Sequence, residues 1–349
     1  MKRFTEFVHK EFLQIFRDSR TMLILLVMPV VLVVLFGYAI TTEVNDTRMA
    51  VFDMAKSQTS QQLIQRFDAN SYFHIETVVD DYDALMPLFR SGKIDMALCI
   101  DADDNVQMLF DGIEPNQANM RSGYAMGIKN SSFINNQSSF INNHLLYNPQ
   151  SKSEYNFVPA IIGMIVMLLC TLMTSISIVR EKETGTMEVL LASPLPPVYI
   201  ILAKLVPYFV ISLANLATIL LLAVFVLHVP MAGSLAVFLA ISVLYILVAL
   251  ALGLLISTCV GSQLAAMLLS LLTIVPTMYF SGMVFPIESM PEALQAIPNF
   301  IPARWYMDAA RRIMIQGVEM QYVVKNFVVL AVMLVVLLAV SLSLYKKRL

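Results

Sequence analysis

The chain has 349 residues, of which 58% are hydrophobic and only 14% are charged, and its mean hydropathy is +0.72. Soluble domains carry about a quarter charged residues, so this is the composition of a protein that resides in a lipid bilayer. The formal net charge of −2 gives no reason to expect a nucleic-acid partner. Cys99, Cys170 and Cys259 are too few and too isolated for a disulfide framework or a metal site.

Residues 1–20 have the pattern of an amphipathic helix. Its apolar side chains fall on one helical face: Phe4, Phe7, Val8, Phe12, Ile15 and Phe16. Arg3, Lys10 and Arg17 recur every seven residues on the opposite face. This pattern predicts a helix that lies on the cytoplasmic leaflet with its cations near anionic lipid headgroups. Glu11 falls inside the apolar sector, where it is either a solvated carboxylate or a contact with a partner protein.

Six apolar runs of about twenty residues are each long enough to cross a hydrocarbon core about 30 Å thick. They cover residues 21–40, 157–178, 203–227, 235–256, 264–285 and 323–344. The first is not a cleaved signal peptide, because it is too long and lacks a small-x-small cleavage site. We therefore expect an α-helical polytopic membrane protein with about six transmembrane helices, five of them in residues 157–349.

Positive charges in the short loops orient these spans. With an even number of spans, both termini lie on one side of the membrane. If that side is the cytoplasm, the inner segments hold Lys2, Arg3, Lys10, Arg17, Arg20, Arg180, Lys182, Lys204, Lys346, Lys347 and Arg348. The short outer segments then hold only Arg304, Arg311, Arg312 and Lys325. Because Lys and Arg favour the cytoplasmic side, we expect cytoplasmic termini and an extracytoplasmic segment at residues 41–156.

Residues 41–156 have the pattern of a folded α/β domain inserted between the first and second spans. The expected strands are residues 49–53, 72–78, 94–100 and 106–110, and the expected helices are residues 57–67 and 82–90. Residues 115–146 read as one long helix of roughly 45 Å. Four of its apolar side chains are seven residues apart on one face: Met126, Phe133, Phe140 and Tyr147. We expect this seam to pack against its own domain or a second protomer, or to dock another protein.

No catalytic constellation is recognisable in the sequence. The segment Arg90–Lys93 lacks the upstream glycine of a phosphate-binding loop, and neither a zinc-protease nor a serine-hydrolase motif occurs. We therefore expect no enzyme activity, cofactor or metal in this chain. The cores of the six spans contain no ionisable residue, whereas ion-coupled transporters often place one at mid-membrane. Energy for transport must then come from a partner.

The loop after the second span combines clustered charges with a turn and a short helix. Its candidate residues are Arg180, Glu181, Glu183, Gly185, Thr186 and Glu188. Gly185 permits a sharp turn, Thr186 can cap a helix over about residues 185–192, and Glu188 suits the positive end of that helix. Such a helix has the shape to fill a groove in another protein. A bare connector between two spans is the alternative.

Hydroxyl groups are the polar groups available inside the spans. Ser270, Thr273 and Thr277 recur at three- and four-residue spacing on the fifth span, and Thr171 and Thr174 lie on the second. A path lined by such groups suits amphipathic molecules that enter from the bilayer. The alternative is that these hydroxyls bond to backbone carbonyls one turn back.

Small residues form a second stripe, at positions 249, 253 and 257 of the fourth span. Ala249, Gly253 and Ser257 let another helix approach closely, from the same protomer or from a second one.

Proline-rich joints precede the last span. Ser289 and Glu292 form a capping box for a helix through Ala296, and a further helix is expected over residues 302–317. Non-helical joints are tolerated at membrane depth only where they are buried in protein or line a cavity. An outer gate is one interpretation and an inert interfacial lid is the other. The gate residues would be Ser281, Gly282, Pro286, Pro291, Pro298 and Pro302.

Two long motifs carry a family resemblance. The Arg-Glu-Lys-Glu-Thr-Gly-Thr-Met-Glu-Val-Leu-Leu-Ala-Ser-Pro run at 180–194 and the Phe-Ser-Gly-Met-Val-Phe-Pro-Ile-Glu-Ser-Met-Pro run at 280–291 resemble those of bacterial ABC type-2 permeases, in the drug-efflux branch. Weaker matches lie at Lys10-Glu11 with Arg17-Asp18 and around Asp111. The turn at residues 53–57 departs from the family pattern, which puts any family role of that turn in doubt.

The resemblance implies a transmembrane subunit that dimerises with the same or a related chain. It also implies cytosolic ATPase subunits that hold ATP and magnesium and bind the coupling helix at about residues 185–192. Residues 1–20 would be the connecting helix beside it, giving Glu11 a partner-facing role, and residues 286–317 would hold re-entrant helices. A periplasmic adaptor protein is a further candidate partner, and the bacterial cytoplasmic (inner) membrane is the expected location.

The expected function is therefore that of an ABC exporter permease that moves amphipathic or drug-like molecules out of the cytoplasm or inner leaflet. Export of lipid or polysaccharide is the alternative within this class. An ion-coupled secondary transporter is disfavoured by the uncharged spans and by the absence of matching halves. A membrane-anchored sensor or assembly platform is disfavoured because it has no need of a coupling loop.

Overall fold

The computed structural model describes residues 2–17, 19–39, 47–111, 115–132, 154–186, 197–284, 287 and 290–347. The chain divides into two compact units, which we treat separately. The helical unit comprises Met1–Thr41 and Ser153–Leu349, and the α/β unit comprises Thr42–Lys152.

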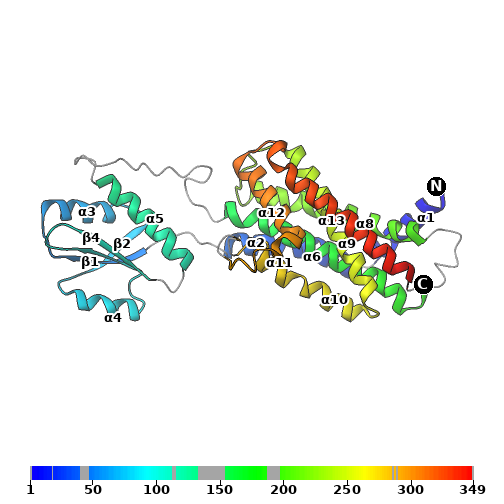
Figure 1. Cartoon of the computed structure of the whole chain (residues 1–349), viewed down its shortest axis with the longest axis horizontal. Coiled ribbons are helices and arrows are strands. Elements are labelled where there is room, and N and C mark those ends of the chain that lie inside the picture. The colour runs from blue at the N-terminus through cyan, green and yellow to red at the C-terminus, as the bar shows by residue number, and fades with distance from the viewer. Residues whose placement is uncertain are drawn as a thin grey trace. The chain divides into compact units, whose positions relative to one another are not determined.

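The helical unit contains one amphipathic helix and a bundle of apolar helices. Its elements are α1 (Lys2–Arg17), α2 (Ser19–Ala39), α6 (Glu154–Glu183), α8 (Pro197–Phe225), α9 (Leu235–Cys259), α10 (Gln263–Leu272), α11 (Ile274–Phe280), η3 (Ile297–Phe300), α12 (Pro302–Arg311), η4 (Arg312–Gln316) and α13 (Met320–Lys347). Both chain termini lie at the same end of this unit (Figure 1), as an even number of spans requires.

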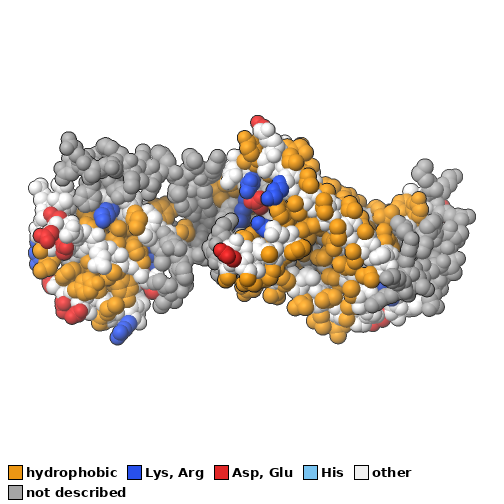
Figure 2. Space-filling model, in the orientation of Figure 1, with side chains coloured by type: hydrophobic (Ala, Val, Ile, Leu, Met, Phe, Trp, Pro, Cys, Tyr) orange, Lys and Arg blue, Asp and Glu red, His pale blue; other side chains and the backbone are white. Residues whose placement is uncertain are grey.

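Five stretches of described helix are long and apolar enough to cross a membrane. They are Glu154–Glu183, Tyr199–Phe225, Leu235–Cys259, Gln263–Phe280 and Met320–Leu344. α2 covers the first predicted span and contains a shorter apolar stretch, Leu26–Leu35. On the face shown in Figure 2, hydrophobic side chains cover the middle of the helical unit and charged ones gather towards its ends. This is the surface of a multi-pass membrane protein.

α6 is the central helix of the bundle and packs against α2, α8, α9, α10 and α12. The buried share of its most apolar window is 67%, against 11% for α13, so α6 lies inside and α13 at the edge. α9 approaches α6 closely at Gly253, where an added Cβ would lie 2.7 Å from the carbonyl oxygen of Thr171. The small-residue stripe therefore packs within the same protomer, one of the two uses predicted for it.

The fifth span is broken, whereas the sequence predicted one continuous helix over residues 264–285. α10 ends at Leu272 and α11 begins at Ile274, with Thr273 between them. Pro276 has no amide hydrogen, and its ring clashes with the carbonyl of the residue four positions earlier, which is Leu272. Pro276 therefore accounts for the break, which falls one turn before it.

The predicted helix ending at Ala296 is also wrong. Residues 292–296 form turns, with Leu294 N donating to Pro291 O at 2.8 Å, and a 3-10 helix follows at Ile297–Phe300. The prolines at 291 and 298 leave too few residues to nucleate an α-helix. Ser289 lies outside the described residues. The next helix is confirmed: α12 and η4 run from Pro302 to Gln316 and end at Gly317, whose φ of 65° is left-handed.

The α/β unit is a four-stranded sheet in the order β2-β1-β3-β4. The strands are β1 (Thr47–Asp53), β2 (Phe73–Val79), β3 (Met96–Ile100) and β4 (Val106–Phe110), and β1 is parallel to β2 and β3 while β4 is antiparallel to β3. The helices are α3 (Gln58–Asp68), η1 (Tyr82–Ala84), α4 (Leu85–Arg90) and α5 (Pro115–Ser132). α3 and α5 cover one face of the sheet and α4 the other (Figure 1). The predicted strands and the two short helices are thus confirmed to within about two residues at most ends.

α5 covers only the first part of the predicted long helix. Ala125 on this helix is fully buried against the sheet, whereas Met126 is 50% exposed. Met126 is the one seam residue that the structure describes, and it does not pack on the sheet of the α/β unit. Phe133, Phe140 and Tyr147 lie outside the described residues.

One carboxylate joins three elements of the α/β unit. Asp95, just before β3, accepts hydrogen bonds from the guanidinium of Arg48 on β1 at 3.0 and 3.1 Å, and Arg121 of α5 lies 3.6 Å away. Burial by itself would raise the pKa of Asp95, but the hydrogen bonds from Arg48 and the charges of Arg121 and Arg48 outweigh it and lower the pKa.

Candidate functional site

The end of α6 carries the charged cluster that the sequence singled out, and we call Arg180–Thr186 the coupling stem. α6 continues to Glu183, and Gly185 then turns the chain with a φ of 71°. Thr184 Oγ1 donates to Arg180 O at 2.9 Å and Thr186 Oγ1 to Glu181 O at 3.3 Å, so both hydroxyls satisfy carbonyls left open at the helix end. The predicted turn at Gly185 is confirmed. Glu188 and the rest of the predicted coupling helix after Thr186 lie outside the described residues.

A buried group of charges ties the coupling stem to two other helices. Lys204 Nζ of α8 lies 2.6 Å from Glu181 Oε1 and 3.0 Å from Glu11 Oε2 of α1. The side chains of these three residues are only 3%, 8% and 3% exposed, respectively. Lys10 Nζ, which is half exposed, lies 3.1 Å from Glu11 Oε1 and 3.9 Å from Glu181 Oε1. Two carboxylates and two ammonium groups therefore balance in charge and join α1, α6 and α8.

The position of Glu11 corrects the sequence interpretation. Glu11 is neither solvated nor directed at a partner protein, because the apolar face of α1 packs on α8 and buries it. A carboxylate on such a face needs a buried counter-ion, which Lys204 supplies. Sequence reasoning counted Lys204 only as a loop charge. The available signal was its place inside an apolar run, residues 200–206, opposite an anomalous acid on another helix.

Lys182 and Glu183 of the coupling stem contact the ends of α9 and α10, on either side of the turn that joins these helices. Lys182 Nζ donates to Ser257 O at 2.6 Å. Glu183 Oε2 accepts from Gln263 N at 3.2 Å and from Gln263 Nε2 at 2.8 Å. The Arg180 side chain is exposed. Gln263 and Lys182 were not among the predicted site residues.

The three hydroxyls of the fifth span have different partners. Thr273 Oγ1 donates to Ser270 O at 2.6 Å and Thr277 Oγ1 to Thr273 O at 2.8 Å. These two hydroxyls therefore have the backbone-bonded geometry of the alternative interpretation. Ser270 is fully buried, and its Oγ lies 2.8 Å from Ser175 Oγ on α6.

The two hydroxyls of the second span face α9. Thr171 Oγ1 donates to Ala249 O at 3.3 Å. Thr174 is buried, and its Oγ1 has no hydrogen-bond partner among the described residues. On α6, Thr171 and Thr174 thus face α9, while Ser175 of the same helix contacts Ser270 of the fifth span.

α12 lies at the end of the helical unit away from the termini (Figure 1). Of the predicted outer-gate residues, Pro302 begins α12, Pro298 lies in η3 just before it, and Ser281 follows α11. Ser281, Pro298 and Pro302 are buried, Pro291 is exposed, and Gly282 has a φ of 79°. Pro286 lies outside the described residues.

Arg311, which sequence reasoning did not select for the gate, holds α12 in place. Its Nε donates to Asn156 O at the start of α6, and its Nη1 donates to Gly282 O, both at 3.1 Å.

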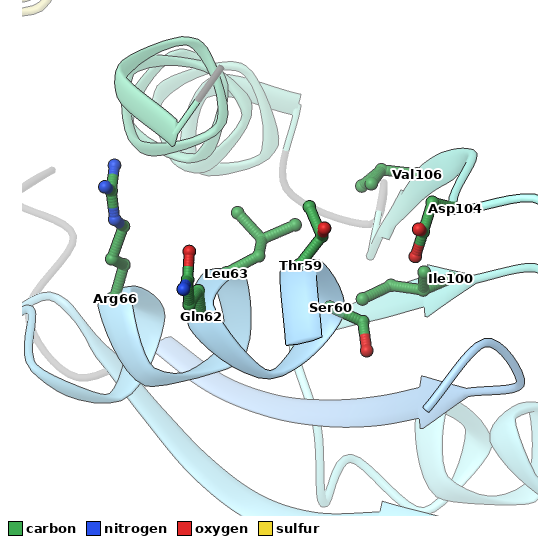
Figure 3. Close-up of a pocket in the computed structure, with 8 residues that line it drawn as sticks. All are labelled: Thr59, Ser60, Gln62, Leu63, Arg66, Ile100, Asp104 and Val106. Carbon is green, nitrogen blue, oxygen red and sulfur yellow. The ribbon is translucent and has the colours of Figure 1, made fainter. Parts of the chain in front are cut away.

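The α/β unit has a shallow pocket between α3 and the β3–β4 hairpin (Figure 3). It is lined by Thr59, Ser60, Gln62, Leu63, Arg66, Ile100, Asp104 and Val106. Ser60 Oγ donates to Asp53 at 2.6 Å, and Asp104 accepts from Ser57 Oγ at 2.7 Å. Several polar groups here are therefore already engaged within the unit.

Comparisons with known proteins agree with this architecture. Residues 20–343 match the model of the ABC-2 family transporter protein. The chain is similar to two probable multidrug ABC transporter permeases of Escherichia coli (strain K12): YbhS, 29% identical over 329 residues (88% of this chain, 87% of YbhS), and YbhR, 27% identical over 333 residues (90% of each). It is also 23% identical over 285 residues to ABC transporter G family member 20 of Dictyostelium discoideum, covering 80% of this chain and 37% of that longer protein. The chain therefore belongs to the ABC-2 transporter family and is an ABC transporter permease.

Proposed function

We propose that this permease exports amphipathic or drug-like molecules from the cytoplasm or the inner leaflet, driven by ATP and magnesium in a separate ATPase subunit. The observation that carries the proposal is the buried charge group, which fixes α1 and α8 to the coupling stem. The names of YbhS and YbhR support the substrate class. The permease acts as a dimer in the bacterial inner membrane.

The geometry supports a mechanism of coupling. The ATPase binds the helix predicted after Gly185, and movement of the ATPase displaces the coupling stem. Because Lys204 is shared by Glu11 and Glu181, α1 and α8 move with α6 rather than independently. Separating them exposes charge to a poorly solvated interior, which costs several kcal/mol. Displacement of the coupling stem therefore moves α1, α6 and α8 together.

The path and gate are part of the same proposal. A path along α6 uses Ser270, Thr171 and Thr174, and it opens when α10 or α9 moves away from α6. Thr273 and Thr277 follow Ser270 along the same span, towards the joint after α11. α12 closes the outer end, held there by Arg311.

The proposed topology has six spans, cytoplasmic termini and an extracytoplasmic α/β unit. Single cysteines at positions 57 and 193, replacing Ser57 and Ser193 in a background without native cysteines, report on it. An impermeant thiol reagent applied to intact cells should label only position 57. Labelling of both positions from outside would overturn the six-span arrangement.

The function is tested by export of ethidium from proteoliposomes that contain the permease and its cognate ATPase. Gly185→Val forces a β-branched residue into a left-handed turn, and Glu188→Lys sets a cation at the positive end of the helix predicted over about residues 185–192. Both variants should insert normally, lose stimulated ATPase activity and lose export. Gly92→Val is the control, since Gly92 in the α/β unit has a left-handed φ of 63° and a Cβ there also meets no atom within 4 Å. Normal coupled export by both loop variants would reduce the loop to a connector.

A further inference from the structure

Two neighbouring side chains of the coupling stem hold the ends of two different spans. Lys182 Nζ donates to Ser257 O in the last turn of α9, and Glu183 Oε2 accepts from the backbone and side-chain amides of Gln263, the first residue of α10. We call these contacts the Lys182–Glu183 clamp. Only the short turn at residues 260–262 separates the two helix ends.

The charges of the clamp match the ends that they hold. The last turn of a helix has free carbonyls and a partial negative charge, which suits the ammonium of Lys182. The first turn has free amides and a partial positive charge, which suits the carboxylate of Glu183. Ser262 already caps Ala265 N, so Glu183 binds an amide that the side-chain cap leaves open. Exchanging the two charges would set each against an end of its own sign.

α10 is the helix whose first residue the clamp holds, and its main packing partner in the bundle is α6. Only 17% of the apolar window of the fifth span is buried within the chain. From Gln263 to Leu272, α10 is about 15 Å long. Ser270, three residues before the break, contacts Ser175 of α6.

We propose that the Lys182–Glu183 clamp transmits movement of the coupling stem directly to the α9–α10 turn, and so tilts α10 away from α6. The proposal rests on the proposed function and adds a second route to it: the charge group moves α1 and α8, and the clamp moves α10. Lys182 and Glu183 are then positioning residues. Their loss should separate ATP hydrolysis from transport instead of abolishing both.

The first test compares Glu183→Ala and Glu183→Gln with Glu76→Ala, a control at an exposed glutamate of β2. A charged hydrogen bond is worth about tenfold in an equilibrium, so the ethidium exported per ATP hydrolysed should fall about tenfold in Glu183→Ala. ATPase activity should stay within about twofold of wild type. Glu183→Gln still accepts a hydrogen bond, so its ethidium export per ATP should lie between those of wild type and Glu183→Ala. Loss of ATPase activity in step with export would assign Glu183 to the ATPase contact and overturn the clamp.

A covalent bridge provides the decisive test. Cysteines replace Glu183 and Gln263 in a background without native cysteines, and a short bifunctional thiol reagent joins them. Export per ATP should be low before bridging and recover after it, because the bridge replaces the lost hydrogen bonds. Unchanged or reduced export after bridging would contradict the clamp.

The two proposals fail in different ways. A wild-type complex that hydrolyses ATP without moving ethidium contradicts the proposed function. If the wild-type complex exports ethidium normally and Glu183→Ala exports as much per ATP, the result contradicts the clamp and leaves the proposed function intact.

Discussion

Replacing Lys204 with methionine removes the ammonium group that two buried carboxylates share. Glu11 and Glu181 would lose contacts of 3.0 and 2.6 Å while remaining almost fully enclosed. Breaking a buried ion pair from one side costs about 3–5 kcal/mol, because the remaining charge is left without compensation. Lys10 keeps its contact with Glu11, so we expect a loss near the lower limit, about 3 kcal/mol. That loss corresponds to a fall of roughly 5–10 °C in unfolding temperature.

The assay is thermal unfolding of the purified permease in detergent, with export measured in parallel. Lys93→Met, at an exposed lysine of the α/β unit, is the matched control. The combination of Glu11→Gln, Glu181→Gln and Lys204→Met removes the charges of all three buried side chains of the group. Most of the stability that Lys204→Met loses should therefore return. If Lys204→Met unfolds at the wild-type temperature, or the neutral combination is no more stable than Lys204→Met, the electrostatic reasoning is refuted.

Three further predictions follow from individual contacts. Gly253→Leu should sharply reduce folded yield, because its side chain would enter backbone of α6, whereas Gly261→Leu should be tolerated. Equal yields would contradict the packing. The lowered pKa of Asp95 stabilises the α/β unit fully above its usual value of 3.8, and this stabilisation is lost as pH falls through the lowered value. The protection factors of the β3 amides, which are corrected for the intrinsic pH dependence of exchange, should therefore fall at acid pH in wild type, and Asp95→Asn should have lower protection factors at neutral pH that change little on acidification. Thr277→Val should transport normally, since its hydroxyl bonds to the carbonyl of Thr273 one turn back and makes only a weak contact of 3.6 Å with the sulfur of Met167 on α6. Thr277→Phe should lower ethidium export with basal ATPase activity intact if the stripe faces the path, and normal export at normal abundance would exclude it.

Local patterns predicted much of the architecture because their causes are local. Alternation of apolar residues predicted the strands, since one face of each strand packs under α3 and α5. Gly185 and Gly317 predicted turns at helix ends, and both have a positive φ. The break at Thr273 was equally local, and the signal was Pro276, whose effect falls one turn before it.

The partners of the charged residues could not be predicted in this way. Glu11 and Lys204 are 193 residues apart in sequence, and only the packing of α1 on α8 brings them together. The same holds for Glu183 and Gln263, which are 80 residues apart. A helical pattern shows that a charge is misplaced on an apolar face, but the fold decides which residue compensates it.

The strengths of these contacts indicate which parts of the bundle stay fixed during transport. The bond between Ser175 and Ser270 joins two neutral hydroxyls, so breaking it costs about 1 kcal/mol, and water or a substrate can replace it. Separating Lys204 from its two carboxylates costs about three times as much or more. Both contacts involve α6, and Ser175 and Glu181 are only six positions apart on it. A displacement of the coupling stem should therefore leave α1, α6 and α8 joined at their base and open the weaker contact between α6 and α10 first. In the proposed mechanism, the charged contacts lie where the ATPase would act, and the neutral hydroxyl contact lies where the path would form.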